Sequence, residues 1–83
     1  MARSKEEQAR RARKYGRRMR LLKAQANAKE FDKLARALLA ELRTAGVTRE
    51  RIAALERGLE YTDVTRHRAA VWAIVQALED VEG

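Results

Sequence analysis

No proline interrupts this chain, and its apolar residues recur at intervals of three and four positions. That spacing marks one face of a helix, whereas a half-buried strand would need an apolar residue at every second position. β-Branched residues are sparse and nowhere alternate with polar ones. The sequence therefore predicts an all-α fold, a small three-helix bundle that carries a basic N-terminal arm.

Residues 27–83 begin with the signals of a first bundle helix. Asn27 and Glu30 have the spacing of a capping box. One apolar stripe follows them: Phe31, Leu34, Leu38 and Leu42. Gly46 suits the position just after a helix end, where a positive φ is needed. These signals place a helix between about residue 28 and residue 45.

The rest of the chain contains signals for two more helices. Thr48 is the expected N-cap of a short helix over residues 49–57, and Gly58 closes that helix. The last helix ends near Val81 and has three competent N-caps: Thr62, Asp63 and Thr65. Its expected apolar stripe is Val64, His67, Val71, Ile74, Val75 and Leu78. Residues 27–83 are thus interpreted as one three-helix domain.

Positive charge is concentrated at the N-terminal end of the chain. Ten of the 19 Lys and Arg residues lie in the first 28 positions, against two acidic residues, so this part carries a formal +8. The remaining positions hold nine basic and ten acidic side chains. Crowded like charges repel one another, and their natural partner is a polyanion. We expect residues 1–26 to form an arm that is disordered alone and helical once neutralised.

The arm also shows the spacing of a helix. Its apolar residues form one stripe: Ala12, Tyr15, Met19, Leu22 and Ala26. This stripe predicts the face by which the arm docks, and it lies roughly 120° around the helix from the stripe that starts at Phe31. One straight helix could not bury both stripes in the same core. We therefore expect a bend near Asn27, and the alternative is one long helix with two separate partners.

The composition offers little material for catalysis or metal binding. One serine, one histidine and no cysteine cannot supply a nucleophile, its base and an orienting group. The chain also lacks a glycine-rich phosphate loop and any paired Cys/His spacing. We expect neither an enzyme, nor a metal site, nor a cofactor. His67 is expected to be half-buried and hydrogen-bonded to a carbonyl or an acid.

Residues 46–58, GVTRERIAALERG, followed by residues 62–68, resemble a helix-turn-helix. The first helix of that family often reads Gly-Val-Thr-x-x-x-Ile-Ala-x-Leu, and here Ile52, Ala53 and Leu55 match its core positions. Three further residues match the exposed start of its recognition helix: Thr62, Thr65 and Arg66. The resemblance implies DNA binding, although the turn is longer than the usual three to four residues. An ordinary three-helix bundle with good caps is the alternative.

The arm and the helix-turn-helix resemblance together predict a small nucleic-acid-binding protein, more for DNA than for RNA. A regulator or accessory factor of phage or plasmid type is expected. The candidate contact residues are Arg10, Arg11, Arg13, Lys14, Arg17, Arg18, Arg20, Lys23, Thr62, Thr65, Arg66 and Arg68. The residues of the arm are expected to neutralise phosphates, and Thr62, Thr65 and Arg66 are expected to face the grooves of the nucleic acid.

Two other functions remain open from the sequence. Residues 8–14, QARRARK, resemble the arginine-rich peptides of lambdoid phage antitermination proteins, which implies RNA binding. The other alternative is a protein-interaction module or inhibitor, either a subunit of a larger nucleic-acid-processing complex or a binder of one. Such a module would hold a stoichiometric protein partner without nucleic acid.

The last expectations concern assembly and location. The 55 near-neutral residues approach the lower limit for a monomeric core, and no cysteine is available to support it, so a homodimer is one expected form. The longest apolar run, residues 69–75, has seven residues, against roughly 20 needed to span a bilayer. We expect no membrane partner, no secretory signal and a cytoplasmic location.

Overall fold

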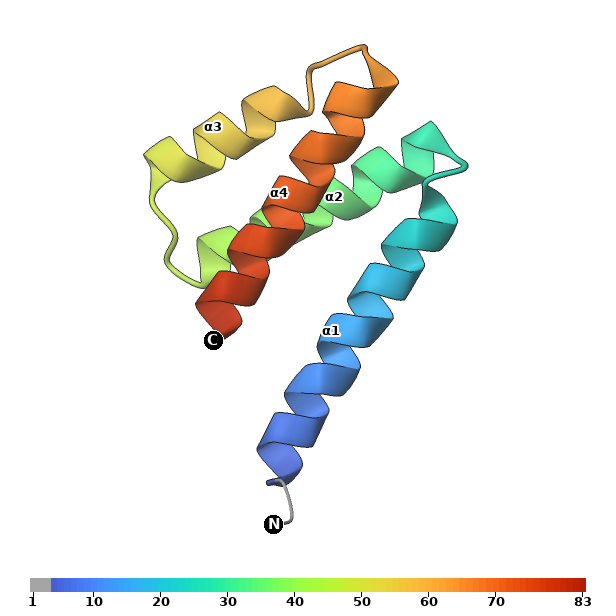
Figure 1. The fold of residues 1–83 in the computed structure, drawn as a ribbon. Helices are drawn as coiled ribbons and strands as arrows, with labels where there is room; N and C mark the ends of the chain where they lie inside the picture. The colour runs from blue at the N-terminus through green and yellow to red at the C-terminus, as the bar shows by residue number, and fades with distance from the viewer. Residues whose placement is uncertain (1–3) are drawn as a thin grey trace.

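The computed structural model describes residues 4–83, and this part of the chain consists of four α-helices (Figure 1). Their bounds are Lys5–Ala24 for α1, Ala28–Thr44 for α2, Arg49–Gly58 for α3 and Val64–Glu82 for α4. No strand occurs among residues 4–83, which confirms the all-helical prediction. The fold is a thin slab that measures 47 × 30 × 16 Å along its principal axes.

The helices begin where capping side chains are available. A side-chain oxygen accepts a hydrogen bond from the backbone amide three residues later in each case, at 3.2 Å for Asn27, 3.3 Å for Thr48 and 2.9 Å for Asp63. Asp63 is thus the N-cap of α4 among the three candidates. Gly46 has a φ of 88°, the left-handed conformation that favours glycine after a helix end. The expected break near Asn27 is confirmed between α1 and α2.

The core lies where α2 and α4 pack against each other, with α3 added at one edge. Its buried side chains include Phe31, Leu38 and Leu42 from α2, Ile52 from α3, and Val71, Ile74, Val75 and Leu78 from α4. Three positions correct the sequence interpretation. Ala53, expected among the core residues of α3, is exposed. Val64 is 62% exposed, because it belongs to the first turn of α4 at the edge of the fold. Leu59, from the connector between α3 and α4, is buried in the core instead.

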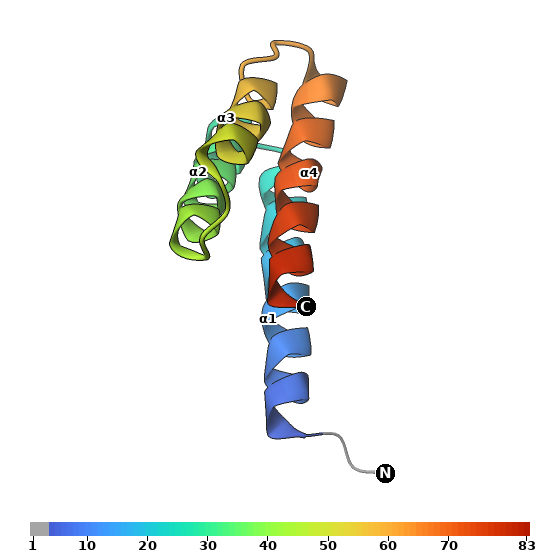
Figure 2. The same cartoon turned by 90° about the vertical axis from the view of Figure 1, so that its left-hand side faces the viewer.

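Helix α1 packs along α4 in the opposite direction and also contacts α2 (Figures 1 and 2). It contributes Leu21, only 1% exposed, and Ala24 to the core. The expected docking stripe of the arm is therefore wrong, because Tyr15 and Leu22 are 68% and 49% exposed. Arg17 lies on the buried face instead. Its positive charge is tolerated there because it forms an ion pair with the carboxylate of Glu82 in α4.

The two helices of the helix-turn-helix-like segment, α3 and α4, approach each other closely. A Cβ atom placed on Gly58 would lie 2.6 Å from the Cβ atom of Ala70, closer than two such atoms can approach. Gly58 therefore does more than end α3, because its missing side chain lets α3 pack against α4.

Within the described part of the chain, no helix combines the length and the apolar character of a membrane span.

Candidate nucleic-acid interface

Two of the candidate arginines, Arg17 and Arg18, form tight ion pairs with glutamates of the same chain. The guanidinium of Arg17 donates two hydrogen bonds of 2.8 Å to the carboxylate of Glu82. Arg18 donates in the same way to Glu79, at 2.7 and 2.6 Å. Bidentate pairs of this kind are the strongest ion pairs that Arg forms. They fasten the middle of α1 to the last turns of α4.

These contacts change the acidity of both partners. The hydrogen bond to Glu82 raises the pKa of Arg17, and the hydrogen bond to Glu79 raises the pKa of Arg18. The same two bonds lower the pKa of Glu82 and of Glu79, although desolvation opposes this shift. All four groups are therefore charged at neutral pH. The positive charges of Arg17 and Arg18 are balanced within the fold.

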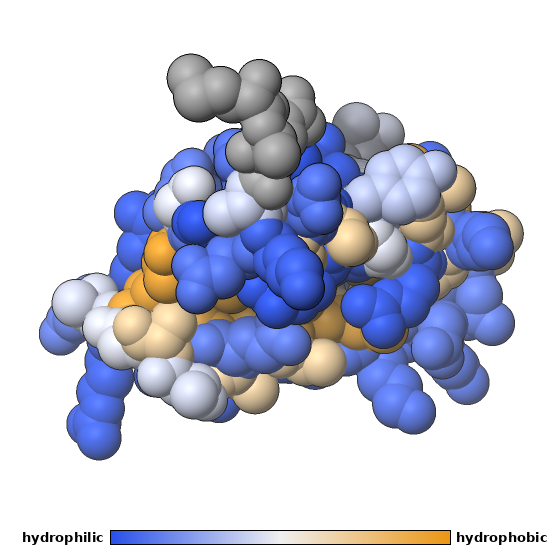
Figure 3. All heavy atoms as spheres, turned by 90° about the horizontal axis from the view of Figure 1, so that it is seen from below, coloured by the Kyte–Doolittle hydropathy of each residue, from blue (hydrophilic) through white to orange (hydrophobic). Residues whose placement is uncertain are grey.

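The cations in the first half of α1 are held much less tightly. Arg10 and Arg13 are exposed and form no ion pair within residues 4–83. Arg11 and Lys14 are largely exposed, and each lies 3.9 Å from a glutamate oxygen, of Glu7 and Glu79 respectively. At that distance the contacts are loose. Figures 1 and 2 show this part of α1 extending past the end of α4. Hydrophilic side chains cover most of the face seen from that end (Figure 3).

Two further candidates lie in the second half of α1. Arg20 and Lys23 are exposed, and within the described chain neither forms an ion pair. They follow the exposed cations of the first half along the same helix. The candidate set of the arm is thus divided by the tertiary structure: Arg17 and Arg18 are occupied, and the others face solvent.

The remaining candidates surround the start of α4, whereas Arg17 and Arg18 bind to its last turns. Thr62, Thr65, Arg66 and Arg68 are all exposed, as the helix-turn-helix resemblance requires. The guanidinium carbon of Arg66 lies 5.6 Å from the ring centroid of Tyr61. Arg68 donates a hydrogen bond of 3.5 Å to a backbone carbonyl at the end of α1. This group is therefore anchored to the α1–α2 turn and the connector.

The fold separates these two groups of basic residues. Arg66 and Glu79, which mark the two ends, are 13 positions apart on α4, or about 20 Å at 1.5 Å per residue. A compact anion cannot contact both groups. An extended polyanion can, because about 20 Å corresponds to roughly six base pairs at 3.4 Å each.

The helix-turn-helix resemblance remains a prediction. The connector has five residues, 59–63, and α3 and α4 lie close together at the connector and diverge away from it (Figure 1). The usual motif has a turn of three to four residues and helices at about 90–120°. The outer face of α4 is nevertheless open, and its residues are Thr65, Arg66, Ala69, Ala73 and Gln76.

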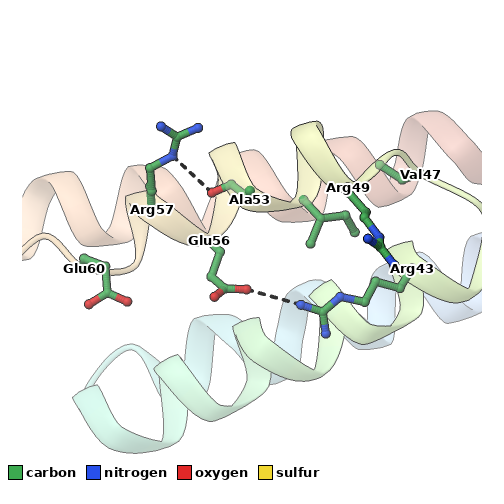
Figure 4. A pocket seen from close by; sticks show the side chains of 8 residues that line it. Arg43, Val47, Arg49, Ala53, Glu56, Arg57 and Glu60 are labelled. Atoms are coloured by element: carbon green, nitrogen blue, oxygen red, sulfur yellow. Dashed lines mark hydrogen bonds and ion pairs between the residues drawn. The ribbon is translucent and has the colours of Figure 1, made fainter.

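A groove of about 770 Å³ between α2 and α3 gathers further arginines that the sequence did not single out (Figure 4). Arg43 donates a hydrogen bond of 3.3 Å to Glu56, and Arg57 donates one of 3.4 Å to the carbonyl of Ala53 in its own helix. A second glutamate also lines the groove. The mixed charge makes this groove a weaker polyanion site than the exposed part of α1.

A smaller cleft of about 440 Å³ opens where the α1–α2 turn meets the connector. Tyr61 and Lys29 line it together with Arg68. Neither Tyr61 nor Lys29 belongs to the sequence-based candidates, because each lies outside the arm and outside the recognition-helix pattern. The one local feature that could have indicated this cleft is the aromatic Tyr61, in a connector whose sequence otherwise predicts only a turn.

His67 confirms the expectation of a half-buried histidine that is hydrogen-bonded to an acid. Its Nε2 atom lies 3.3 Å from Oδ1 of Asp32. Desolvation acts to raise the pKa of Asp32, but the hydrogen bonds from Arg36 and His67 outweigh it, and the pKa lies below its ordinary value. Residues 4–83 contain no cluster of three or more His, Asp or Glu side chains that could hold a metal ion.

No protein family model, curated protein or solved structure matches this chain. The function must therefore be inferred from the charge, exposure and spacing of its own side chains.

Proposed function

We propose that this chain is a small nucleic-acid-binding protein that prefers DNA to RNA and serves as a regulator or accessory factor. The supporting observation is the row of exposed cations on the first half of α1. Helix α1 has nine basic and two acidic side chains, and tight ion pairs occupy only Arg17 and Arg18. An exposed excess of this size favours a polyanion as the partner.

The proposed division of labour follows from the two ends of the fold. Arg10, Arg11, Arg13 and Lys14 neutralise phosphates, which positions the protein without reading the sequence. Thr65 and Arg66 approach a second stretch of the same nucleic acid, about 20 Å away along α4. The occupied arginines act within the protein instead, because their bidentate pairs fix the direction of α1 relative to α4.

Fluorescence anisotropy with a labelled duplex at increasing salt concentration tests this proposal. If about six phosphates are engaged, the logarithm of the binding constant falls against the logarithm of the salt concentration with a slope of about −5. A variant with Arg10, Arg11, Arg13 and Lys14 replaced by glutamine should bind weakly, with a slope shallower by about three to four.

A matched control removes the same number of charges from another surface: Lys33, Arg49, Arg51 and Arg57 to glutamine. All four are exposed and lie outside the proposed interface, so the control should keep most of the affinity. Equal losses in the two variants would show that only net charge matters. Undetectable binding to duplex DNA and structured RNA at low salt would end the proposal. Stronger binding to an RNA hairpin would favour the arginine-rich RNA-binding alternative.

A second candidate function, a protein-interaction module, is favoured by one observation. Tyr15 and Leu22 are exposed on α1, and the half-buried Met19 lies between them on the same stripe. An apolar stripe at this spacing suits an amphipathic partner helix. A stoichiometric partner that survives nuclease treatment, and that a Tyr15→Ser/Leu22→Ser variant loses, would support this function. Loss of DNA binding in the same variant would argue against two separate surfaces.

A further inference from the structure

The cleft between the α1–α2 turn and the connector has an apolar interior and an aromatic edge. Phe31 and Leu59 line it and are almost fully buried. Tyr61 and Val64 also line it, yet they are 50% and 62% exposed. Large apolar side chains that stay exposed around a hollow commonly mark a binding surface. The cleft therefore suits a ligand with a flat apolar face.

The cations at this cleft are available to a ligand, whereas only one of its two acids, Glu60, is. Asp32 is bonded to Arg36 at 2.8 Å and to a histidine. Glu60 is exposed and lies 3.8 Å from the same Arg36, a loose contact, so two cations face one loosely held acid. Within residues 4–83, neither Lys29 nor Arg68 forms an ion pair, and Arg68 donates one hydrogen bond to a backbone carbonyl, at 3.5 Å. The charge left to meet a ligand is therefore positive.

Tyr61 is placed to stack with a planar group. The guanidinium of Arg66 lies over its ring at 5.6 Å from the centroid, so an incoming ring would use the other face. An aromatic face beside cations is the combination that holds unpaired bases, because the ring stacks on the base and the cations bind the flanking phosphates. Paired bases inside a duplex do not offer a free face to such a ring.

We infer that this cleft binds one unpaired base of a DNA ligand. The base stacks on Tyr61 above Phe31 and Leu59, and Lys29 and Arg68 bind the adjoining phosphates. This inference rests on the proposed nucleic-acid-binding function and adds the form of the ligand: a duplex with an extruded base or a single-stranded end. It also gives the connector a role that a simple turn does not have.

The test compares three labelled probes of one sequence by fluorescence anisotropy: a continuous duplex, a duplex with one extra unpaired adenine, and the same bulge without its base. The full chain should bind the adenine bulge about tenfold more tightly than the continuous duplex. The bulge without its base should bind like the continuous duplex. Tyr61→Ala should remove the preference, whereas Tyr61→Phe should keep it.

The chain offers a matched control, because its other tyrosine is exposed on α1, away from the cleft. Tyr15→Ala should therefore leave the preference intact. Unchanged affinity of Tyr61→Ala for the continuous duplex would show that this variant is folded. Equal binding of all probes, or a preference that survives Tyr61→Ala, would overturn the inference and leave the proposed function standing. Binding to none of the probes would overturn both.

Discussion

Arg17 and Glu82 lie 65 positions apart in the chain, and their side chains meet through two hydrogen bonds of 2.8 Å. Arg17 is 9% exposed and the side chain of Glu82 is 34% exposed, so the contact between α1 and α4 is buried on the side of Arg17 and partly open on the side of Glu82. The pair joins the basic N-terminal arm to the last turn of the protein. A buried cation that loses such a partner is costly, because its charge has already left water.

The first prediction concerns this pair. Arg17→Gln and Glu82→Gln should each lower the free energy of unfolding by about 1.5–3 kcal/mol, because each leaves a charged group without its bidentate partner. Urea denaturation of both single variants and of the double variant measures the coupling. A double variant that loses much less than the sum of the two single losses is expected. Strictly additive losses would show that the two side chains do not interact in solution.

Adjacent leucines give the second prediction. Leu21→Ala should cost about 2–5 kcal/mol, because it removes a fully buried side chain from the core. Leu22→Ala should change stability by no more than about 0.5 kcal/mol, because that side chain faces solvent. Thermal melting by circular dichroism compares the two. The opposite order would show that Tyr15, Met19 and Leu22 form the docking face after all.

Deletion of residues 1–25 supplies a coarser check that α1 packs on the core. It removes Leu21 and Ala24 from the core and exposes the side chains that they cover, so the melting temperature should fall. A deletion of residues 1–12 leaves both core residues and both tight arginine pairs in place. It should melt close to the full chain. Equal melting of all three proteins would show that residues 27–83 are stable without α1.

The third prediction uses two helical glycines. Gly58→Ala should destabilise the fold by about 1–3 kcal/mol, because its new Cβ atom would collide with Ala70. Gly16→Ala is the control, since the added Cβ would meet no atom within 4 Å beyond the nearby backbone of its own helix, and it should stabilise α1 by up to about 1 kcal/mol. Ala70→Gly should rescue much of the Gly58→Ala loss in urea denaturation. A stabilising Gly58→Ala would contradict the close packing of α3 on α4.

The fourth prediction is a loss of stability in acid. Glu79 and Glu82 have pKa values below their ordinary 4.5, chiefly because Arg18 and Arg17 donate hydrogen bonds to them. Each carboxylate therefore binds its proton less readily in the folded state than in the unfolded state. The stability that they add is complete above about pH 4.5 and disappears as the pH falls through the folded pKa values.

Urea midpoints measured between pH 7 and pH 3 test this prediction. The native chain should lose stability below about pH 4.5, where the unfolded carboxylates take up protons. A Glu79→Gln/Glu82→Gln variant should start less stable and show a flatter decline. Parallel curves for the two proteins would show that the acid sensitivity comes from other groups, of which Asp32 is one with a lowered pKa.

Local features of the fold were predictable from the sequence alone. The caps at Asn27 and Thr48 and the positive φ at Gly46 depend on groups within three or four residues of each other, so residue type and spacing determine them. The stripe from Phe31 to Leu42 was predictable for the same reason: one helix face repeats locally. At the start of α4, Thr65 and Arg66 are exposed as the helix-turn-helix resemblance implied, whereas the exposure of Val64 contradicts its place in the expected apolar stripe.

The buried face of α1 was decided by tertiary structure. Apolar periodicity selected the side with Tyr15 and Leu22, because the pattern counts only apolar residues. The side that packs contains Arg17, and its partner Glu82 lies in the last turn of the protein. No local rule relates two positions that far apart.

The candidate interface shows the same division. The sequence determined that the arm is basic and helical in pattern, since charge and periodicity are properties of neighbouring residues. Only the folded chain separates the arginines that carboxylates of α4 neutralise from those left to solvent, and only it brings Lys29, Tyr61 and Arg68 around one cleft. The physical reason is that ion pairing and clefts depend on distances in space, and packing of the helices sets those distances.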